Sequence, residues 1–253
     1  MNRQVPNIKY TIIGDGKVAR HFAYYFNAKG VRFNRWHRRQ SIELKSLVEH
    51  SSCVLLLISD DAIIPLVNHY TFLKSKTLVH FSGVLSHKQV KGCHPLMTFG
   101  QHHYDLKTYE SMPFVCDEKV NFKTLFPQLT NPSYSISACH KAFYHAMCVM
   151  AGNFTQVLMR ETSQQLQEYQ LPKDILFPYL LQNTLNFIKD PQKSITGPLQ
   201  RGDFSTISKH LSVLQKNRLE GVYKSFLKLA SYQSATDATS SSPKNNKQSK
   251  GVV

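Results

Sequence analysis

Residues 14–19 constrain the fold of this chain more than any other segment. They read Gly-Asp-Gly-Lys-Val-Ala, directly after the apolar run 8–13 and at the start of a stretch with helical spacing. In a strand–loop–helix unit of this kind, the first glycine permits a tight turn and the second lets the backbone approach a pyrophosphate, which then lies on the helix amides. The motif predicts a dinucleotide site; the alternative is a βα turn that is merely rich in glycine. The predicted contact residues are Gly14, Asp15, Gly16, Lys17, Val18 and Ala19.

Short β-like runs alternate with helical stretches in the first half of the chain, and helices alone follow. The predicted strands cover 8–13, 31–35, 53–59, 77–82 and 113–116, and the predicted helices cover 18–28, 139–169, 174–188, 203–216 and 218–231. Strands that alternate with helices indicate a parallel sheet with right-handed crossovers. We therefore expect an α/β fold: an N-terminal Rossmann-type domain over 1–117, a connecting segment over 118–138 and an all-α C-terminal domain over 139–233. Residues 234–253 are polar and without periodicity, so they are expected to be disordered.

The end of the second predicted strand decides which dinucleotide fits. Sites for NAD usually place Asp or Glu there, about 20 residues beyond the loop, to hold the ribose hydroxyls. This chain has no acid over 33–39, and Arg35, His37 and Arg38 stand where a 2′-phosphate would lie. Arginine can bind a phosphate through two hydrogen bonds, and Trp36 or Arg35 could stack on the adenine. NADP is therefore expected in preference to NAD; the alternatives are a solvated basic loop or a loop that binds RNA.

The chain is strongly basic, with 31 Lys+Arg against 16 Asp+Glu and a formal net charge of +15. This charge favours an anionic partner: nucleic acid, a membrane surface or a phosphorylated small molecule. Hydrophobic residues make up 42% of the chain, which is enough for a buried core. The apolar run near the N-terminus is too short for a signal peptide, and no run approaches the ~18–20 residues of a membrane helix. We expect a soluble, cytoplasmic protein without a membrane partner.

Cysteine and histidine patterns give no sign of a scaffold or a metal site. The five cysteines are odd in number and include no CxxC pair, so reduced thiols are expected rather than a disulfide framework. The twelve histidines include no HExxH and no His-x3-His pair. We therefore expect no metal.

The loop 196–203, between two predicted helices, offers candidate substrate contacts. Its two glycines and Pro198 suit a fixed backbone, and Asp203 can cap the helix that follows. Arg201, with Thr196 beside it, could then hold a substrate carboxylate or phosphate. Alternatively, Arg201 pairs with an acid and only pins the loop. A small anionic substrate is the expectation that follows from the first reading.

The helical half also predicts self-association. Its helices carry apolar residues on more than one face, as the segments 177–181 and 222–229 show. One apolar stripe would pack within the domain and another would seek a partner. We therefore expect a homodimer formed through this half.

Several short motifs, in their order and spacing, resemble the Rossmann-like protein family that carries a DUF2520 C-terminal domain. That family is related to the pyrroline-5-carboxylate reductase, ketopantoate reductase and β-hydroxyacid dehydrogenase group. The motifs are the glycine loop, 58–63 (ISDDAI), 80–83 (HFSG), 94–99 (HPLMTF), 144–146 with Asn153, and 196–203 with His210. The resemblance covers nearly the whole predicted folded chain. It implies an NADP-binding domain and a helical domain that commonly dimerises, without a particular substrate.

The resemblance also implies site residues, and two positions depart from it. Ser59 stands where the family usually has Pro, and Met97 stands in place of Gln, which removes a polar contact from the pocket. In the related dehydrogenases the reacting centre lies at the start of the first long C-terminal helix, where Lys141 and His145 share a face at i, i+4. Either could protonate the group that receives hydride; the alternative is a solvated lysine and a histidine satisfied in the core. The other implied contacts are Ser59, Asp60, Ser82 and Gly83 for the cofactor, and Asn153 and His94 for the substrate, with a backbone-bonded His94 as the alternative.

Three functions remain open from the sequence. The leading one is an NADP-dependent oxidoreductase that transfers hydride between the nicotinamide and a small, anionic carbonyl, imine, alcohol or amine in an interdomain cleft. The alternative is an NADP-binding sensor or scaffold without turnover, which needs the same glycine loop. The third is nucleic-acid binding through the +15 charge, for which no known recognition motif is present.

Overall fold

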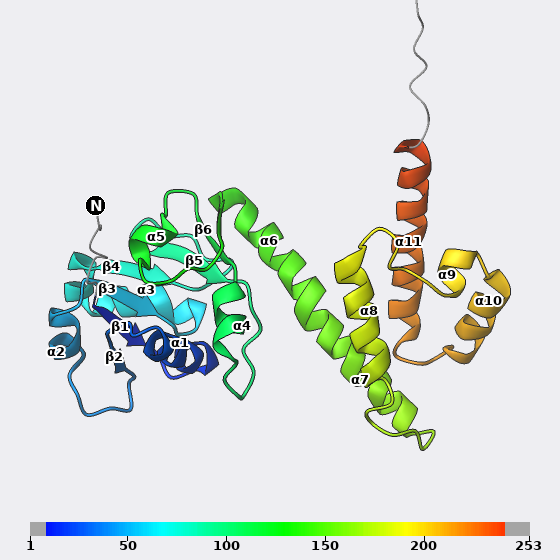
Figure 1. Ribbon diagram of the computed structural model, residues 1–253, viewed down its shortest axis with the longest axis horizontal. Helices are drawn as coiled ribbons and strands as arrows, with labels where there is room; N and C mark the ends of the chain where they lie inside the picture. The colour runs from blue at the N-terminus through cyan, green and yellow to red at the C-terminus, as the bar shows by residue number, and fades with distance from the viewer. Residues whose placement is uncertain (1–8, 241–253) are drawn as a thin grey trace, which may run out of the picture. The chain divides into compact units, whose positions relative to one another are not determined.

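The computed structural model describes residues 9–240, and the chain forms two compact units, Met1–Glu161 and Thr162–Val253. The first unit contains a seven-stranded sheet with helices on both faces, and the second is helical (Figure 1). The predicted fold class, a Rossmann-type sheet domain followed by helices, is confirmed. Strands give way to helices at 136–138, where the connecting segment was expected to end. The compact units, however, divide farther along, inside α7 (Thr155–Gln167).

The first unit alternates strands and helices along the chain. The strands are β1 (Tyr10–Ile13), β2 (Phe33–Trp36), β3 (Cys53–Leu56), β4 (Thr77–His80), β5 (Lys91–Pro95), β6 (Phe114–Asp117) and β7 (Ser133–Ile136). The helices between them are α1 (Lys17–Ala28), α2 (Leu44–Glu49), α3 (Asp60–His69), the 3₁₀ helix η1 (Thr71–Ser75), α4 (Leu106–Ser111) and α5 (Phe122–Leu125).

The strand order places the glycine loop at a reversal in the sheet. The order is β2-β1-β3-β4-β5-β6-β7, and all neighbours are parallel except β5 and β6. The chain leaves β1 towards β2 and then returns past β1 to β3, so the winding direction changes between β1 and β3. In open α/β sheets, ligands bind outside the carboxyl ends of the strands at such a point.

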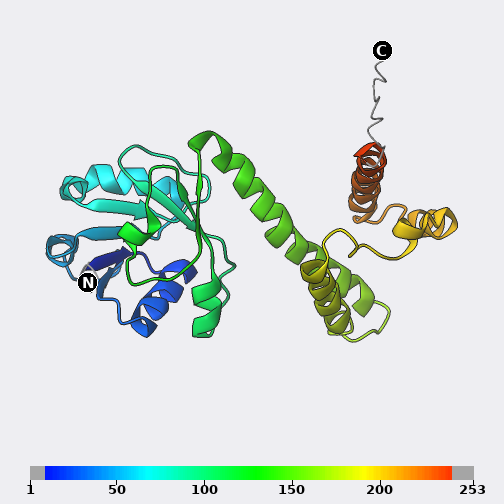
Figure 2. The ribbon, with the colours of Figure 1, turned by 45° about the horizontal axis from the view of Figure 1, so that its top comes forward.

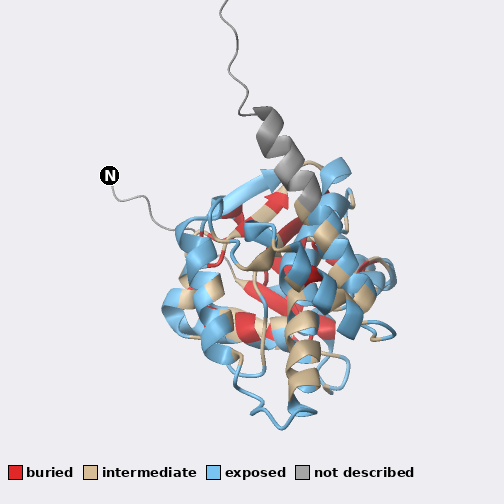
Figure 3. Ribbon diagram, turned by 90° about the vertical axis from the view of Figure 1, so that its right-hand side faces the viewer, coloured by how far each residue is buried: buried red, intermediate tan, exposed pale blue. Residues whose placement is uncertain are grey.

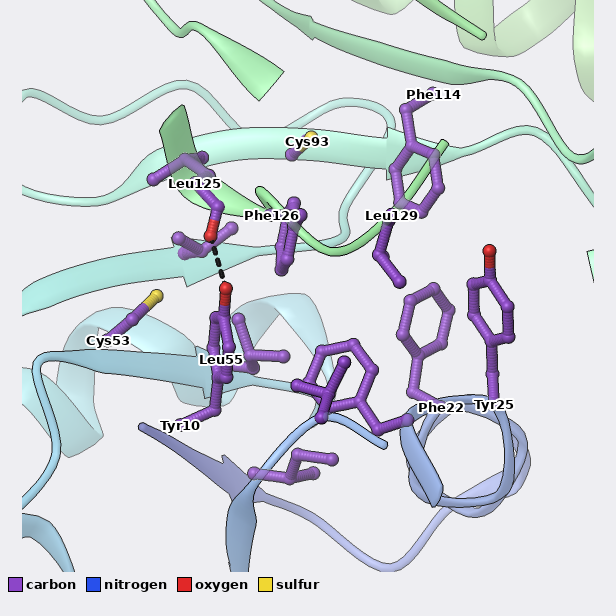
Figure 4. Packing of buried hydrophobic residues seen from close by; sticks show 14 of the residues in the cluster. Tyr10, Phe22, Tyr25, Cys53, Leu55, Cys93, Phe114, Leu125, Phe126 and Leu129 are labelled. Carbon is purple, nitrogen blue, oxygen red and sulfur yellow. Dashed lines mark hydrogen bonds between the residues drawn. The ribbon is translucent and has the colours of Figure 1, made fainter. Parts of the chain in front are cut away.

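Central strands are buried on both faces. Alternate residues point to opposite sides of a strand: Tyr10 of β1 packs with Phe22 of α1, whereas Ile13 packs with Ile63 of α3. Figure 2 shows α1 in blue and α3 in cyan on opposite sides of the sheet. In the first cluster, the Tyr10 hydroxyl donates to the Leu125 carbonyl at 2.6 Å, so its burial leaves no unmet polar group (Figure 4).

Two strands, β5 and β7, were not among the predicted strands. They read KGCHP and SYSI, which lack the continuous apolar run of β3, CVLL. Their pairing partners hold them in the sheet, since β5 lies between β4 and β6 and β7 pairs with β6. Strand structure here depends on contacts far along the chain rather than on local composition.

A disulfide between Cys93 and Cys116 corrects the expectation of reduced thiols for this pair. The two residues lie directly opposite each other in the antiparallel β5–β6 register, with their Cα atoms 4.0 Å apart. They are 23 residues apart in sequence, and only the strand pairing brings them together. Cys53, Cys139 and Cys148 are free.

The remaining regular elements of the described chain are helices. They are η2 (Ala138–His140), α6 (Lys141–Cys148), the π-helix η3 (Val149–Phe154), α7, α8 (Phe177–Lys189), α9 (Pro198–Arg201), α10 (Phe204–Val213) and α11 (Glu220–Ser240). Helix α11 continues to Ser240, into the segment that was expected to be disordered from residue 234; residues 241–253 lie outside the described chain. Within the described residues, no helix is both long enough and apolar enough to cross a membrane.

Candidate functional site

The glycine loop passes from β1 to α1 between the ends of β2 and β3. The Gly14 amide donates to the Trp36 carbonyl at 2.9 Å, and the Leu57 amide donates to the Ile13 carbonyl at 2.8 Å. Gly14 has φ of +140°, and a Cβ there would clash with the Leu57 carbonyl oxygen. The same Cβ would lie 3.5 Å from that of Ala19, the small residue on which α1 approaches the loop. Gly14 and Ala19 therefore serve the packing of loop, strand and helix.

Gly16 is different, because folding alone does not require glycine there. Its φ is −72°, and a Cβ would meet nothing within 4 Å. Gly16 is the N-cap of α1, and within the described residues no side chain caps this helix end. The first-turn amides are therefore available to an anion, which the helix dipole also favours. The open space before Gly16 is a cradle of the kind that a close-approaching phosphate needs.

A cavity of about 520 Å³ opens at the carboxyl ends of β1, β3 and β4. It extends from the start of α1 to the loop after β4. Pockets for small ligands commonly measure ~300–1,000 Å³. The predicted cofactor residues that line the cavity are Asp15, Gly16, Lys17, Val18, Ser59, Asp60 and Ser82. The structure thus brings together residues from three separate segments of the sequence.

The basic group at the end of β2 is held by an acid from the glycine loop. Arg35 Nη2 donates to Asp15 Oδ1 at 2.5 Å, and Arg35 Nε donates to the Gly14 carbonyl at 3.4 Å. Asp15 Oδ2 also accepts from Arg20 Nη2 at 3.3 Å. The hydrogen bond from Arg20, with smaller contributions from other nearby basic charges, holds the pKa of Asp15 below its usual range. Asp15 and Arg35, both predicted as cofactor contacts, are therefore also partners of each other.

The turn after β2 leaves only some of the predicted base and phosphate contacts accessible. Arg38 is exposed and His37 is half-buried. Trp36, in contrast, is buried in the second core cluster, and its Nε1 donates to the Ile42 carbonyl at 2.9 Å. The expectation that Trp36 could stack on an adenine is therefore wrong, because the ring is part of the core. Arg35 remains the candidate for that contact.

Ser82 organises the loop after β4. Its hydroxyl donates to Asp60 Oδ2 at 2.5 Å and accepts from the amides of Val84 and Leu85 at 3.1 and 2.9 Å. Asp60 begins α3, so this hydrogen bond ties the end of β3 to the end of β4. Both residues line the cavity, whose far side is therefore fixed by a side-chain contact.

Helix α6 brings two polar rings next to this loop. A Cβ at Gly83 would overlap the His145 ring, so His145 packs directly on the loop backbone. His94 Nδ1 and the Tyr144 hydroxyl share a hydrogen bond of 2.8 Å, and the His94 and His145 ring centroids are 5.6 Å apart. Burial lowers the pKa of His94 to about 4, and the neighbouring His145 acts in the same direction. Burial and the neighbouring Cys148 thiol raise the pKa of Tyr144. At neutral pH, His94 and Tyr144 are thus uncharged hydrogen-bonding groups.

His80 and Tyr144 were not predicted as site residues. His80 ends β4 and is fully buried; the Ser82 amide donates to its Nδ1 at 3.2 Å. Burial lowers the pKa of His80 to about 4, so the neutral ring carries its proton on Nε2, which has no partner among the described residues. Both residues could have been found from their position next to predicted site residues. Tyr144 directly precedes His145, and His80 stands in the same short motif as Ser82.

Lys141, predicted as a proton donor, is buried and ion-paired at the start of α6. Its side chain is 3% exposed, and Nζ donates to Asp117 Oδ1 at 2.6 Å and to the Leu85 carbonyl at 2.5 Å. The Gly92 amide donates to Asp117 Oδ2 at 2.6 Å, and a Cβ at Gly92 would lie 2.5 Å from Nζ. Lys141 is therefore neither a free proton donor nor a solvated lysine. It is a buried anchor that fastens the start of α6 to β5 and β6.

The other predicted substrate residues are exposed. Asn153 lies in η3 of the first unit. Thr196 and Arg201 belong to the second unit, so they share a compact unit with each other and not with the cavity. Asp203 caps α10 as predicted, with Oδ1 accepting from the Thr206 amide at 3.1 Å. Among the described residues, no group of three or more His, Cys, Asp or Glu side chains could hold a metal ion.

Residues 118–229 match the family model described as a domain of unknown function, DUF2520. The match begins after β6 and ends within α11. The resemblance to DUF2520 proteins is therefore confirmed. The chain matches none of the curated proteins.

Solved structures share the fold over most of the chain. A candidate NADP oxidoreductase from Bacteroides fragilis has a TM-score of 0.72 at 19% identity, covering 88% of this chain and 97% of that one. A Thermotoga maritima protein has a TM-score of 0.68 at 19% identity, covering 90% and 99%. The Plasmodium falciparum pyrroline carboxylate reductase, solved with NADP bound, has a TM-score of 0.56 at 14% identity, covering 90% and 98%. At these identities the likeness shows a common fold.

Proposed function

We propose that this chain, in which a segment that matches DUF2520 follows β6 of a Rossmann-type sheet, is an NADP-dependent oxidoreductase. The observation that carries the proposal is the contrast within the glycine loop. Gly14 is required by the protein's own packing, whereas Gly16 faces open space beside uncapped helix amides. A dinucleotide pyrophosphate fits that space, and the relatives described above as NADP oxidoreductase and pyrroline carboxylate reductase agree with this choice.

Different segments of the chain would bind different parts of the nucleotide. The α1 amides at Lys17 and Val18 would hold the pyrophosphate. Arg35 and Arg38, with His37, would bind a 2′-phosphate at the end of β2, which favours NADPH over NADH. The nicotinamide would lie towards the loop after β4, where the bound cofactor supplies or accepts hydride at C4.

The substrate would be oriented by the rings of α6 and β5. His94 and Tyr144 are uncharged, and one of their two protons forms the hydrogen bond between them. The other proton can be donated to a carbonyl oxygen or an imine nitrogen of the substrate. His145, packed on the Gly83 backbone, remains the candidate for moving a proton to that atom. Lys141 contributes by fixing the start of α6 through Asp117.

A small anionic substrate is part of the proposal, with Arg201 as its contact. Gly197 and Gly202 have φ of +86° and +64°, and Asp203 is locked as the cap of α10, so the loop presents Arg201 from a rigid support. Arg201→Lys keeps the charge but loses the planar fork. That variant should keep its fold and NADPH affinity while losing affinity for the anionic substrate. Early melting with unchanged substrate affinity would mean that Arg201 only stabilises the loop.

A homodimer formed through the second unit completes the proposal. Between residues 162 and 230, Ile207 alone is buried, while α8 exposes large apolar side chains such as Phe177, Leu181 and Ile188. Identical copies can cover such faces with each other in an isologous interface. Light scattering at micromolar concentration should therefore give the mass of two chains, and a monomer mass would exclude this part of the proposal.

A non-catalytic NADP sensor is the second candidate, and the anchored Lys141 favours it, because one predicted proton donor is already occupied. Deuterium transfer separates the two. NADPH deuterated at C4 should deliver its label to a product from a panel of 2-oxo acids and cyclic imines. His145→Ala should abolish the transfer without changing NADPH affinity, whereas the exposed His102→Ala should leave both unchanged. NADPH binding without any label transfer across the panel would support the sensor.

A further inference from the structure

A carboxylate lies at the end of β2 although this strand supplies none. It belongs to Asp15, and the strand register explains its position. Ile13 pairs with Trp36, and the Gly14 amide donates to the Trp36 carbonyl, so the following residue emerges beside the end of β2. There Asp15 Oδ1 accepts from Arg35 Nη2 at 2.5 Å. The glycine loop thus places an acid where sites for NAD usually carry one on the strand itself.

Both members of this pair are accessible to a ligand. Their side chains are 34% and 29% exposed for Asp15 and Arg35, and Asp15 lines the cavity. Nearby basic groups, Arg20 above all, lower the pKa of the carboxyl, which is therefore ionised near neutral pH. A nucleotide that enters the cavity meets an anion and a cation already paired, rather than a free arginine.

We propose that Asp15 sets the nucleotide preference of this site by occupying Arg35 and by offering an acceptor to ribose hydroxyls. The inference rests on the proposed function, because it requires a dinucleotide in the cavity. A 2′-phosphate must share Arg35 with the carboxylate and is repelled by it, whereas a ribose 2′-hydroxyl can donate to the same carboxylate. Asp15 therefore reduces the advantage that the basic turn gives to NADPH and keeps NADH acceptable.

The test is the ratio of NADH to NADPH dissociation constants, measured by calorimetry in wild type and Asp15→Asn. Because Asn keeps the size of the side chain and loses its charge, the ratio should rise at least about fivefold, mainly through tighter NADPH binding. The probe 2′,5′-ADP, which carries the 2′-phosphate without the nicotinamide, should tighten in the same variant. In an Arg35→Gln background, Asp15→Asn should raise the ratio less than it does in wild type, since the competition for Arg35 is gone while the repulsion of the phosphate and the ribose acceptor are still removed.

Two matched variants isolate the effect. Arg20→Gln removes the other partner of Asp15 and should leave the ratio close to that of wild type. Glu49→Gln removes one exposed negative charge away from the cavity and should also leave it unchanged. If wild type binds both nucleotides and Asp15→Asn leaves the ratio unchanged or lowers it, the proposed role of Asp15 is wrong, while the proposed function stands. A wild type that binds neither nucleotide overturns the proposed function itself.

Discussion

The two compact units bury their side chains to very different degrees. In the first, every residue of β1 and β3 is buried, and two apolar clusters cover the faces of the sheet. In the second, over the positions whose burial is described, only Ile207 is buried. Figure 3 colours buried residues red and exposed residues pale blue along the ribbon. The exposed apolar side chains of the second unit include Tyr179, Leu185, Phe187, Phe204 and Phe226. The first unit therefore has a hydrophobic core and a preformed cavity of its own, whereas the second has helix faces whose large apolar side chains are exposed to solvent.

The largest expected effect separates the two units with one pair of matched substitutions. Phe22 is fully buried in the first unit, so Phe22→Ala should lower the free energy of unfolding by about 3–5 kcal/mol. Phe187 is 57% exposed, so Phe187→Ala should lower the free energy of unfolding by less than about 1 kcal/mol at low protein concentration. The same variant should weaken self-association. Urea unfolding at low and high chain concentration measures both. Equal losses in the two variants would show that the second unit has a core of its own.

The next effect distinguishes the two glycines of the loop. Gly14→Ala introduces a Cβ that clashes with the Leu57 carbonyl at φ of +140°, and it should destabilise the chain by about 3 kcal/mol. Gly16→Ala meets open space at φ of −72° and should cost no more than about 1 kcal/mol, because alanine is a poorer N-cap than glycine. Thermal unfolding followed by circular dichroism compares them. A comparable loss in Gly16→Ala would mean that Gly16, too, is needed for packing.

The sequence predicted those elements of the first unit whose structure depends mainly on their own residues. The run at β3 is continuous and apolar enough to read as a buried strand, and Gly14 and Gly16 mark the turn into α1. By contrast, β5 contains lysine, glycine and proline, and it is a strand only because β4 and β6 pair with it. The residues of a strand such as β5 do not by themselves predict which strands it will pair with.

The site shows the same division between local and long-range information. The cavity residues after β1, β3 and β4 follow from the rule that ligands bind at the carboxyl ends of strands. The role of Lys141 could not be predicted, because it depends on Asp117, 24 residues away. The burial of Trp36 could not be predicted either, because it depends on how α2 and α3 pack around the ring. Asp15 as the partner of Arg35 required the register of β1 against β2.

A smaller effect concerns acid stability, which should come from the first unit. Burial lowers the pKa of His94 from 6.5 to about 4, so the unfolded chain binds a proton in this range that the folded chain does not. The stabilisation is therefore full above pH 6.5 and is lost as the pH falls towards 4, by roughly 1 kcal/mol per pH unit. His94→Asn should reduce the slope in urea unfolding and leave the part due to His80, whose pKa burial also lowers to about 4, whereas the exposed His102→Asn should not change it. An unchanged slope in His94→Asn would show that His94 titrates normally.

The space in front of Gly16 offers the most direct test of the central claim, that the cavity of the first unit binds NADP. Gly16→Val fills this space with a side chain that the local backbone accepts, and Gly221→Val makes the same change in α11 of the second unit, where a Cβ also meets nothing within 4 Å. NADPH would be titrated into wild type and both variants by calorimetry. We expect saturable binding by wild type and Gly221→Val, and a loss of at least about tenfold in affinity for Gly16→Val, with a thermal midpoint lowered by no more than about 4 °C through the poorer N-cap. No binding by wild type, or equal affinity in Gly16→Val, would contradict the claim.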